Sequence, residues 1–186
     1  MPPEVIYYVA VSADGYIATA DGRIDWLTPF ETAGEDYGYA AFYASVDAIL
    51  LGRRTYEQCL GFGTWPYADK PCWVFSRLAI QSSQMGVTVT SHEPREVLAS
   101  LQARGLRRAW LVGGGALAGA FRAQGLISHY ILSCIPVMLG GGVPLFTPGG
   151  GQQALTLLDS RIYSNDVVQL RYQAAPAPDY YSPPLS

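Results

Sequence analysis

The first long apolar segment of the chain spans residues 5–11 and is continuous rather than alternating. A continuous apolar run is typical of a central strand that is covered on both faces. Shorter runs predict further strands at residues 47–51, 71–75, 87–90, 109–112 and 130–139, the last interrupted by Pro136. Apolar positions at helical spacing predict helices at residues 34–45, 53–59, 94–104 and 116–124. Gly105 and Gly125 are the expected C-caps of the last two helices.

The end of the chain has a different pattern. Residues 155–163 and 167–173 alternate between apolar and polar side chains, and Ser164-Asn165-Asp166 joins them, which predicts an antiparallel hairpin. The expected fold is therefore a three-layer α/β/α domain with a mixed, mostly parallel central sheet that ends in this hairpin. We expect one domain over residues 1–173 and a proline-rich tail over residues 174–186.

Composition narrows the class of protein. Of the 186 residues, 49% are apolar and 15% are charged, which is typical of a globular chain. A net charge of −3 gives no reason to expect nucleic acid or an anionic membrane as a partner. There is no bilayer-length apolar stretch and no signal-peptide pattern, so we expect a cytoplasmic protein whose three cysteines remain reduced.

The histidines argue against two common kinds of site. His92 and His129 are the only two in the sequence, and neither lies beside a cysteine or a pair of carboxylates. We therefore expect no metal site and no Ser-His-Asp triad.

Two glycine-containing segments follow predicted strands and open predicted helices: Leu51-Gly52-Arg53-Arg54-Thr55-Tyr56 and Leu111-Val112-Gly113-Gly114-Gly115-Ala116. A strand that turns into a helix in this way presents backbone N–H groups and a positive dipole end to an anion. Two such segments predict a ligand with more than one phosphate, most simply a dinucleotide. A Rossmann site is disfavoured because no acidic residue follows at the required distance; the next one is Asp159. The alternative is that the arginines are surface charge and the glycines serve tight turns.

The motifs together resemble a known family. In chain order they are Val11-Ser12-Ala13-Asp14-Gly15-Tyr16-Ile17-Ala18, Asp25-Trp26-Leu27, Leu51-Gly52-Arg53-Arg54-Thr55-Tyr56-Glu57, Trp65-Pro66-Tyr67, Val74-Phe75-Ser76-Arg77, Val112-Gly113-Gly114-Gly115 and Pro136-Val137-Met138-Leu139-Gly140-Gly141-Gly142-Val143-Pro144-Leu145-Phe146. From about residue 5 to residue 173 the chain resembles the dihydrofolate-reductase-like family. More specifically, it is similar to the reductase domain at the C-terminus of the bifunctional riboflavin-biosynthesis deaminase-reductase, and to its stand-alone relatives. The deaminase zinc signature is missing.

The resemblance implies NADPH as cofactor. Ser76 and Arg77 would then face the adenosine 2′-phosphate, and the glycine triplet the pyrophosphate. The nicotinamide and the acceptor would lie near Ala10, Ser12, Asp14, Gly15, Ile17 and Ala18. The implied cofactor-binding residues are Ala10, Ile17, Gly52, Arg53, Arg54, Thr55, Ser76, Arg77, Gly113, Gly114, Gly115, Ala116 and Leu117.

The catalytic acid is not fixed by the resemblance. Trp26-Leu27-Thr28-Pro29 is followed by Glu31, Glu35 and Asp36. Counting from the tryptophan favours Glu31, whereas counting back from Gly52 favours Asp36. We prefer Asp36 or Glu35, which lie at the predicted helix start, and we include Asp14 in the site. Acids at a helix start are also favoured by the dipole alone, and Asp-Gly is a common turn, so a structural role stays open for all of them.

The expected function is NADPH-dependent reduction of a small heterocycle: dihydrofolate, another pterin, or an aminopyrimidine of riboflavin biosynthesis. The alternative is a non-catalytic NADPH-binding dimer that acts as a sensor or scaffold. The resemblance implies a homodimer, to which the apolar strand at residues 130–139 would contribute. Ser128-His129 replaces an acidic pair that relatives usually carry, and we interpret it as a structural or interface difference.

Overall fold

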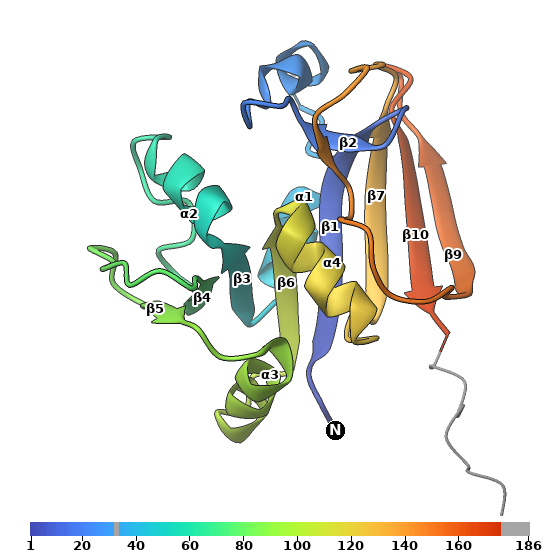
Figure 1. Ribbon diagram of the computed structural model, residues 1–186. Coiled ribbons are helices and arrows are strands. Elements are labelled where there is room, and N and C mark those ends of the chain that lie inside the picture. Colours follow the sequence, from blue (N-terminus) through green and yellow to red (C-terminus); the bar gives the residue numbers. More distant parts are fainter. Residues whose placement is uncertain (32–33, 176–186) are drawn as a thin grey trace, which may run out of the picture.

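The computed structural model describes residues 1–31 and 34–175. Eight strands form one sheet in the order β5-β4-β3-β6-β1-β7-β10-β9 (Figure 1). Their bounds are β1 Glu4–Ser12, β3 Ala48–Gly52, β4 Cys72–Phe75, β5 Val87–Thr90, β6 Arg108–Gly113, β7 His129–Ile135, β9 Leu155–Ile162 and β10 Val168–Ala174. The first six in sheet order are parallel, and β10 pairs antiparallel with both β7 and β9. The predicted mixed sheet with a C-terminal hairpin is confirmed.

Helices cover both faces of the sheet, which confirms the predicted three layers. The helices α1 (Tyr39–Ala44) and α2 (Arg53–Leu60) pack on one face through Phe42, Tyr56 and Cys59. The helices α3 (Pro94–Ala103) and α4 (Gly115–Ala123) pack on the other.

The continuous apolar run at residues 5–11 becomes β1, near the centre of the sheet. Val5 and Tyr7 belong to the core beneath α3 and α4, whereas Ile6 belongs to the core beneath α1 and α2. All three are at most 2% exposed. Both faces of the strand are covered, and this is why the run does not alternate.

The two helices on the α3 side end as their sequences predict. Gly105 and Gly125 have φ of +76° and +65°, a left-handed conformation that glycine adopts without strain. The N–H of the next residue bonds back to the helix: Leu106 donates to the carbonyl of Leu101 at 3.0 Å. At its start, α3 carries a capping box: the side chain of Glu93 accepts the backbone N–H of Glu96, and the side chain of Glu96 accepts the backbone N–H of Glu93.

Two predicted elements are shorter than expected. The helix predicted at residues 34–45 forms only over Tyr39–Ala44, because Tyr37 and Gly38 have φ of +54° and +77° and cannot continue a right-handed helix. The strand predicted at residues 130–139 ends at Ile135. Pro136 has no N–H for the ladder, and the N–H of Val137 turns back to the carbonyl of Ile135 at 2.7 Å.

Three short elements lie in segments whose patterns predicted only loops. The strands β2 (Tyr16–Ala18) and β8 (Val143–Pro144) pair with each other, and η1 (Asp25–Phe30) is a 3-10 helix. Strands of three and two residues are too short to show a periodicity.

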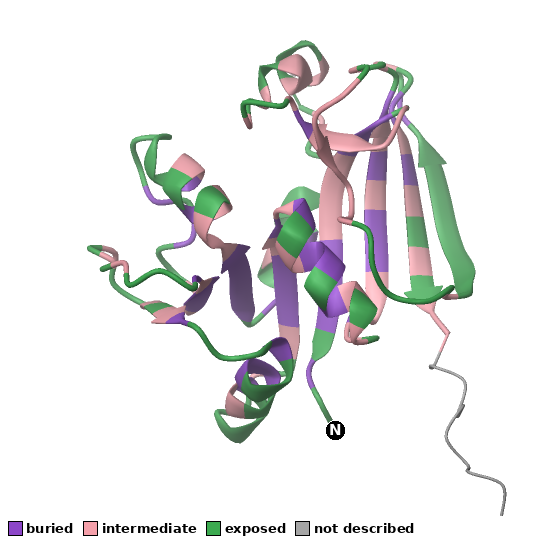
Figure 2. Cartoon of the chain, viewed as in Figure 1, coloured by how far each residue is buried: buried purple, intermediate pink, exposed green. Residues whose placement is uncertain are grey.

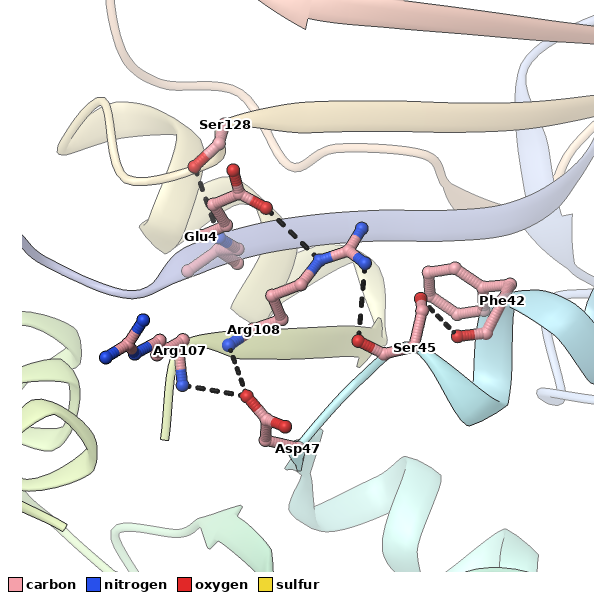
Figure 3. A network of polar contacts seen from close by, with 8 residues as sticks. Glu4, Phe42, Ser45, Asp47, Arg107, Arg108 and Ser128 are labelled. Carbon is pink, nitrogen blue, oxygen red and sulfur yellow. Dashed lines mark hydrogen bonds and ion pairs between the residues drawn. The ribbon is translucent and has the colours of Figure 1, made fainter. Parts of the chain in front are cut away.

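The amino ends of the strands are tied together by ion pairs and hydrogen bonds (Figure 3). The guanidinium of Arg108 lies 3.2 Å from the carboxylate of Glu4 and donates to the carbonyl of Ser45 at 3.3 Å. One carboxylate oxygen of Asp47 accepts the backbone N–H groups of Arg107 and Arg108 at 2.8 and 2.9 Å. At this edge of the sheet, Arg108 already has its partners within the fold.

The far edge of the sheet is open. Figure 2 shows β9 exposed along its whole length. β7, in contrast, is flanked by β1 and β10, so neither of its edges is available for pairing with another chain. The exposed apolar side chains on β9 are Leu155, Leu157, Leu158 and Ile162.

Candidate functional site

The carboxyl ends of the parallel strands open into a cavity of about 1110 Å³. It is lined from the end of β5, across β4, β3 and β6, to β1. With strands about 4.8 Å apart, this edge spans about 19 Å. The cavity is thus long enough to receive an extended ligand along the sheet edge.

The two glycine segments lie side by side at this edge. β3 and β6 are parallel neighbours, and Leu51 pairs with Gly113. A Cβ added to Gly52 would lie 3.4 Å from the carbonyl oxygen of Gly113, and one added to Gly114 would lie 3.5 Å from the hydroxyl of Thr55. The two sequence motifs therefore form one backbone surface, from which α2 and α4 both begin.

Twelve of the thirteen residues expected to bind the cofactor line this single cavity; Gly113 is the exception. Gly113 directly precedes the lining residues, with φ of +114°. Residues from four separate segments of the chain therefore meet at one cavity.

The arginines in the cavity differ in what they contact. Arg53 pairs with Glu57 at 2.7 Å, one turn along α2. Arg54 and Arg77 are exposed and have no partner among the residues that the structure describes. Arg77 follows Ser76, whose hydroxyl donates to the carbonyl of Leu78 and accepts its N–H, so the turn that carries Arg77 is fixed. In contrast to Arg108 at the amino edge, these two guanidiniums are free to bind an anion.

The strands β2 and β8 form a cover that contributes Ile17, Ala18 and Val143 to the cavity. This cover is held tightly against α4. A Cβ on Gly115 would lie 2.2 Å from the carbonyl oxygen of Pro144, and one on Gly119 would lie 2.3 Å from the hydroxyl of Thr147. Only glycine permits this approach, so the glycine at the start of α4 has a packing role in addition to any role toward a ligand.

Asp14 does not line the cavity but holds the loop that leads to the cover. Its carboxylate accepts the hydroxyl of Ser12 at 2.6 Å and the backbone N–H groups of Leu139 and Gly140 at 3.0 and 2.7 Å. These hydrogen bonds, that of Ser12 first, lower the pKa of Asp14. Its observed contacts are those of a residue that fixes a loop.

The other expected acids also lie outside the cavity lining. Glu35 accepts the N–H of Tyr37 at 2.9 Å, and Asp36 accepts those of Ala40 and Gly38 at 3.0 and 2.8 Å. The bonds from Ala40 and Gly38 lower the pKa of Asp36. Both carboxylates thus serve the turn into α1. Glu31 does not line the cavity either.

Several lining residues were not predicted. Thr90 to Pro94, at the step from β5 into α3, form the far end, and their strand-to-helix pattern was the available signal. Tyr8, Cys59 and Phe62 also line the cavity and lie outside every motif, whereas Tyr67 belongs to the motif Trp65-Pro66-Tyr67.

Tyr8 is held by a buried polar network. Its hydroxyl donates to the carbonyl of Tyr37 at 3.0 Å and accepts from the amide of Gln169 at 3.3 Å. The same amide group lies 3.1 Å from the hydroxyl of Ser133. Burial raises the pKa of Tyr8 to about 12, so the phenol is protonated at neutral pH.

Within residues 1–31 and 34–175, no three His, Cys, Asp or Glu side chains are grouped so as to hold a metal ion. In the same part of the chain, no helix has the length and apolar character needed to cross a membrane. The three cysteines are free thiols, and burial raises the pKa of each.

Comparison with known proteins identifies close relatives. The uncharacterized protein YwjB of Bacillus subtilis is 38% identical over 94% of this chain and 100% of its own length. A solved structure from Shewanella sp. PV-4, provisionally assigned to riboflavin biosynthesis, is 29% identical with a TM-score of 0.86, covering 95% of this chain and 100% of the other.

Two more distant structures show the fold. A deaminase/5-amino-6-(5-phosphoribosylamino)uracil reductase of Thermotoga maritima has a TM-score of 0.72 at 14% identity, covering 94% of this chain and 57% of the other. Dihydrofolate reductase of Enterococcus faecalis, complexed with NADP(H), has a TM-score of 0.65 at 15% identity, covering 93% and 97%. The family model of the RibD C-terminal domain matches residues 67–169. The match covers more than half of the chain, and the protein belongs to the RibD C-terminal domain family, with a dihydrofolate-reductase-like α/β fold.

Proposed function

We propose that this protein is an NADPH-dependent reductase of a small heterocyclic substrate, either a pterin such as dihydrofolate or an aminopyrimidine of the riboflavin pathway. One observation carries the proposal. Twelve residues expected to bind the cofactor converge on one cavity, and two arginines there have no partner within the described chain. Membership of the RibD C-terminal domain family supports a reductase of this type.

The residues present fit a phosphate-rich dinucleotide. Arg54 and Arg77 would hold the 2′-phosphate, because a guanidinium binds phosphate oxygens bidentately. The N–H groups at the start of α4, beside Gly114 and Gly115, would hold the pyrophosphate. When bound, the nicotinamide supplies the hydride, and the protein orients it toward the acceptor.

The source of the proton is part of the same proposal. Asp36, Glu35 and Asp14 are the candidate acids, with Glu31 as the other possibility. All of them lie outside the cavity lining. An acid in such a position acts by orienting water or a loop, and water entering the cavity then delivers the proton.

This same placement favours a second candidate function. A protein that keeps the nucleotide site and has no catalytic acid beside it would bind NADPH without turnover. It would then serve as a non-catalytic sensor or scaffold.

We propose a homodimer in the cytoplasm, in line with the family resemblance. The open edge strand β9, with its exposed leucines, is the surface we assign to the contact, because β7 is paired on both sides. We further propose that residues 1–173 form a single domain; most of the expected tail, residues 176–186, lies outside the described residues.

The test is a titration with NADPH and NADH, followed by quenching of the four tryptophans. We expect tight binding of NADPH, much weaker binding of NADH, and oxidation of NADPH when an acceptor is added. Failure to bind either nucleotide would refute both candidate functions.

A series of acid-to-amide variants then distinguishes the two candidate functions, because loss of a catalytic acid lowers the rate at unchanged NADPH affinity. The variants are Glu31→Gln, Glu35→Gln, Asp36→Asn and Asp14→Asn. If the unaltered protein binds NADPH but turns over no acceptor, the result supports the non-catalytic sensor or scaffold.

A further inference from the structure

Tyr37 has an unusual backbone conformation. Its φ is +54°, a left-handed value that a bulky side chain rarely adopts. Among the residues that the structure describes, Asp166 is the only other non-glycine residue with positive φ, and it lies in the turn of the C-terminal hairpin. A strained residue of this kind persists only where its surroundings hold it, and such residues cluster at functional sites.

Hydrogen bonds on several sides hold Tyr37 in this conformation. Its N–H donates to the carboxylate of Glu35 at 2.9 Å, and its phenol donates to the carbonyl of Phe30. The amide of Gln169 donates to its carbonyl at 3.0 Å. The same carbonyl accepts the hydroxyl of Tyr8, also at 3.0 Å. The strained residue thus presents one backbone oxygen to two side chains.

Gln169 lies at the centre of this network. Its amide nitrogen lies 3.0 Å from the carbonyl oxygen of Tyr37, 3.1 Å from the hydroxyl of Ser133 and 3.3 Å from the hydroxyl of Tyr8. Gln169 on β10 and Ser133 on β7 are paired in register and are 7% and 5% exposed. Burying polar groups costs free energy unless they are hydrogen-bonded, whereas apolar side chains would fill the same positions without that cost. Two paired polar side chains in the core therefore indicate that a neighbouring group is held in place.

That group is Tyr8, the one member of the network that lines the cavity. The indole N–H of Trp110 donates to its backbone carbonyl at 3.1 Å, and its ring packs edge to face on Phe42, with 4.8 Å between the centroids. Its hydroxyl is bonded to Tyr37 and Gln169. The single phenolic proton is used in the bond to Tyr37, and burial raises the pKa of Tyr8 to about 12. Backbone, ring and hydroxyl are all fixed, and the proton is not available to a ligand.

We infer that Gln169, from outside the cavity, is a positioning residue that fixes Tyr8 as a rigid contact surface for the acceptor by holding both the Tyr37 carbonyl and the Tyr8 hydroxyl. The acceptor is the ligand concerned because β1 lies two strands from β3, where the arginine-bearing start of α2 follows. Tyr8 contacts the acceptor and gives it no proton, so the network governs acceptor binding and not the chemical step. The inference rests on the proposed function and deepens it.

The experiment is Gln169→Met, which removes both N–H donors at similar size. The KM of the acceptor, dihydrofolate or 5-amino-6-(5-phosphoribosylamino)uracil, should rise about fivefold, the effect of one hydrogen bond. We expect kcat and the dissociation constant of NADPH to stay within about twofold. An unchanged KM, or a fall in kcat alone, would overturn the inference. If this variant does not fold, Gln169→Glu replaces it, because a carboxylate has the same size and no N–H donor.

The matched control is Gln153→Met. The side chain of Gln153 accepts the hydroxyl of Tyr130 at 2.9 Å, and neither residue lines the cavity. Loss of this bond should lower the free energy of unfolding and leave the KM unchanged. An equal rise in KM for both variants would show a general effect of lost stability and would overturn the inference.

A double-mutant cycle tests whether Gln169 acts through Tyr8. In the Tyr8→Phe background there is no hydroxyl to hold, so adding Gln169→Met should change the KM by less than about twofold. The same rise in both backgrounds would show that Gln169 acts independently of Tyr8, and would overturn the inference.

A crystal structure of Gln169→Met separates this inference from the proposed function. If NADPH binds and no acceptor is turned over, the dissociation constants of the two acceptors from the NADP⁺ complex replace the KM. If nucleotide or acceptor does not bind, the proposed function fails, and the crystal structure decides whether Gln169 positions Tyr8. A Tyr8 hydroxyl that has left the carbonyl of Tyr37 supports the positioning role. One that remains within about 3.5 Å of it overturns that role.

Discussion

The two ends of the cavity differ in the side chains that the strands bring to them. At the end formed by β4 and β5, Arg77 is unpaired and Arg54 stands nearby, beside helix starts that present backbone N–H groups. At β1, the lining residues are Tyr8, whose hydroxyl is bonded to the carbonyl of Tyr37, and the apolar Val9 and Ala10. On the proposed function, a ligand with phosphates at one end and a flat ring at the other would be oriented by charge at the first and by shape at the second.

The contrast also appears across the sheet. At the amino edge, Arg108 is bonded to Glu4 and Ser45, so the fold itself uses its charge. At the carboxyl edge, the side chains of Arg54 and Arg77 have no partner in the described chain through which they could stabilise the fold. Charges without a structural partner at the edge where parallel strands end are the strongest physical sign of a ligand site in this molecule.

The largest effect should come from removing the charged end. Arg54→Ala/Arg77→Ala is expected to weaken NADPH binding by about a hundredfold or more, because each hydrogen bond to a charged phosphate contributes about 1.5–3 kcal/mol. NADH binding, which involves no 2′-phosphate, should change much less. Fluorescence titrations with both nucleotides give the two dissociation constants.

The matched control for the double variant is Arg107→Ala, which removes an exposed arginine at the opposite edge of the sheet. It should leave both dissociation constants unchanged. Equal weakening of NADPH and NADH by the double variant would mean that the arginines do not read the 2′-phosphate.

The next largest effect concerns the cover that β2 and β8 form over the cavity. Gly115→Ala forces a methyl group to within 2.2 Å of the carbonyl of Pro144, and we expect a loss of about 1–3 kcal/mol in the free energy of unfolding. Gly151→Ala is the control, since no atom lies within 4 Å of its added Cβ and its φ is not positive. Denaturant unfolding measures both. Equal stability of the two variants would show that the cover can move away from α4 at little cost.

The part of the cavity that contains the glycine segments and the arginines could largely be predicted from the sequence, because the motifs that mark it are local. Gly52-Arg53-Arg54 and Gly113-Gly114-Gly115 each follow an apolar strand directly, and the order of strands in a parallel sheet brings such segments to one edge. The same reasoning would have found Thr90 to Pro94, which also join a strand to a helix. Residues 90–94 contain no glycine, so the search for glycine-containing segments does not detect them.

The hydrogen bonds of Tyr8 and the pairing of β2 with β8 could not be predicted, because their contacts are distant in sequence. The carboxylate of Asp14 bonds to the N–H of Gly140, 126 residues away, and the loop between is irregular. β2 and β8 have too few residues to show alternation. Glu35 and Asp36 are preferred in the sequence because they lie at the start of a predicted helix, but this helix begins at Tyr39, so the preference carries no information on which side chains face the cavity.

A smaller effect is expected for Tyr8, and it should distinguish binding of the acceptor from binding of NADPH. Tyr8→Phe removes the hydroxyl that donates to Tyr37, and we expect a loss of stability of about 1 kcal/mol. It should raise the KM for the acceptor at unchanged NADPH affinity, because Tyr8 lines the cavity from β1, two strands away from β3 and the arginine-bearing start of α2. The control is Tyr39→Phe, whose hydroxyl has no hydrogen-bond partner in the described chain. A change in NADPH affinity alone would place Tyr8 at the other end.

The smallest effect concerns the loop behind the cover and depends on pH. The pKa of Asp14 is lowered in the folded protein, first by the hydroxyl of Ser12. A lowered folded pKa means that this carboxylate stabilises the fold fully above its unfolded pKa, about 3.9, and that the contribution is lost as the pH falls through the folded value. Asp14→Asn should therefore lower Tm at pH 7 and converge with the unaltered protein at the acid end of the range.

Thermal unfolding at pH 7, 5, 4 and 3 tests this, with Asp25→Asn as the control, since Asp25 is exposed and its carboxylate accepts no hydrogen bond in the described chain. A constant difference in Tm between Asp14→Asn and the unaltered protein at every pH would show that the loss is one of packing or geometry and not of charge. Convergence would instead show that the negative charge of Asp14, 125 residues from its partner Leu139, holds the loop in place. The position of the cover would then depend on the charge of Asp14, which would stabilise the fold as the charge of Arg108 does at the opposite edge of the sheet. Arg54 and Arg77, in contrast, are the charges in the cavity that we assign to a ligand.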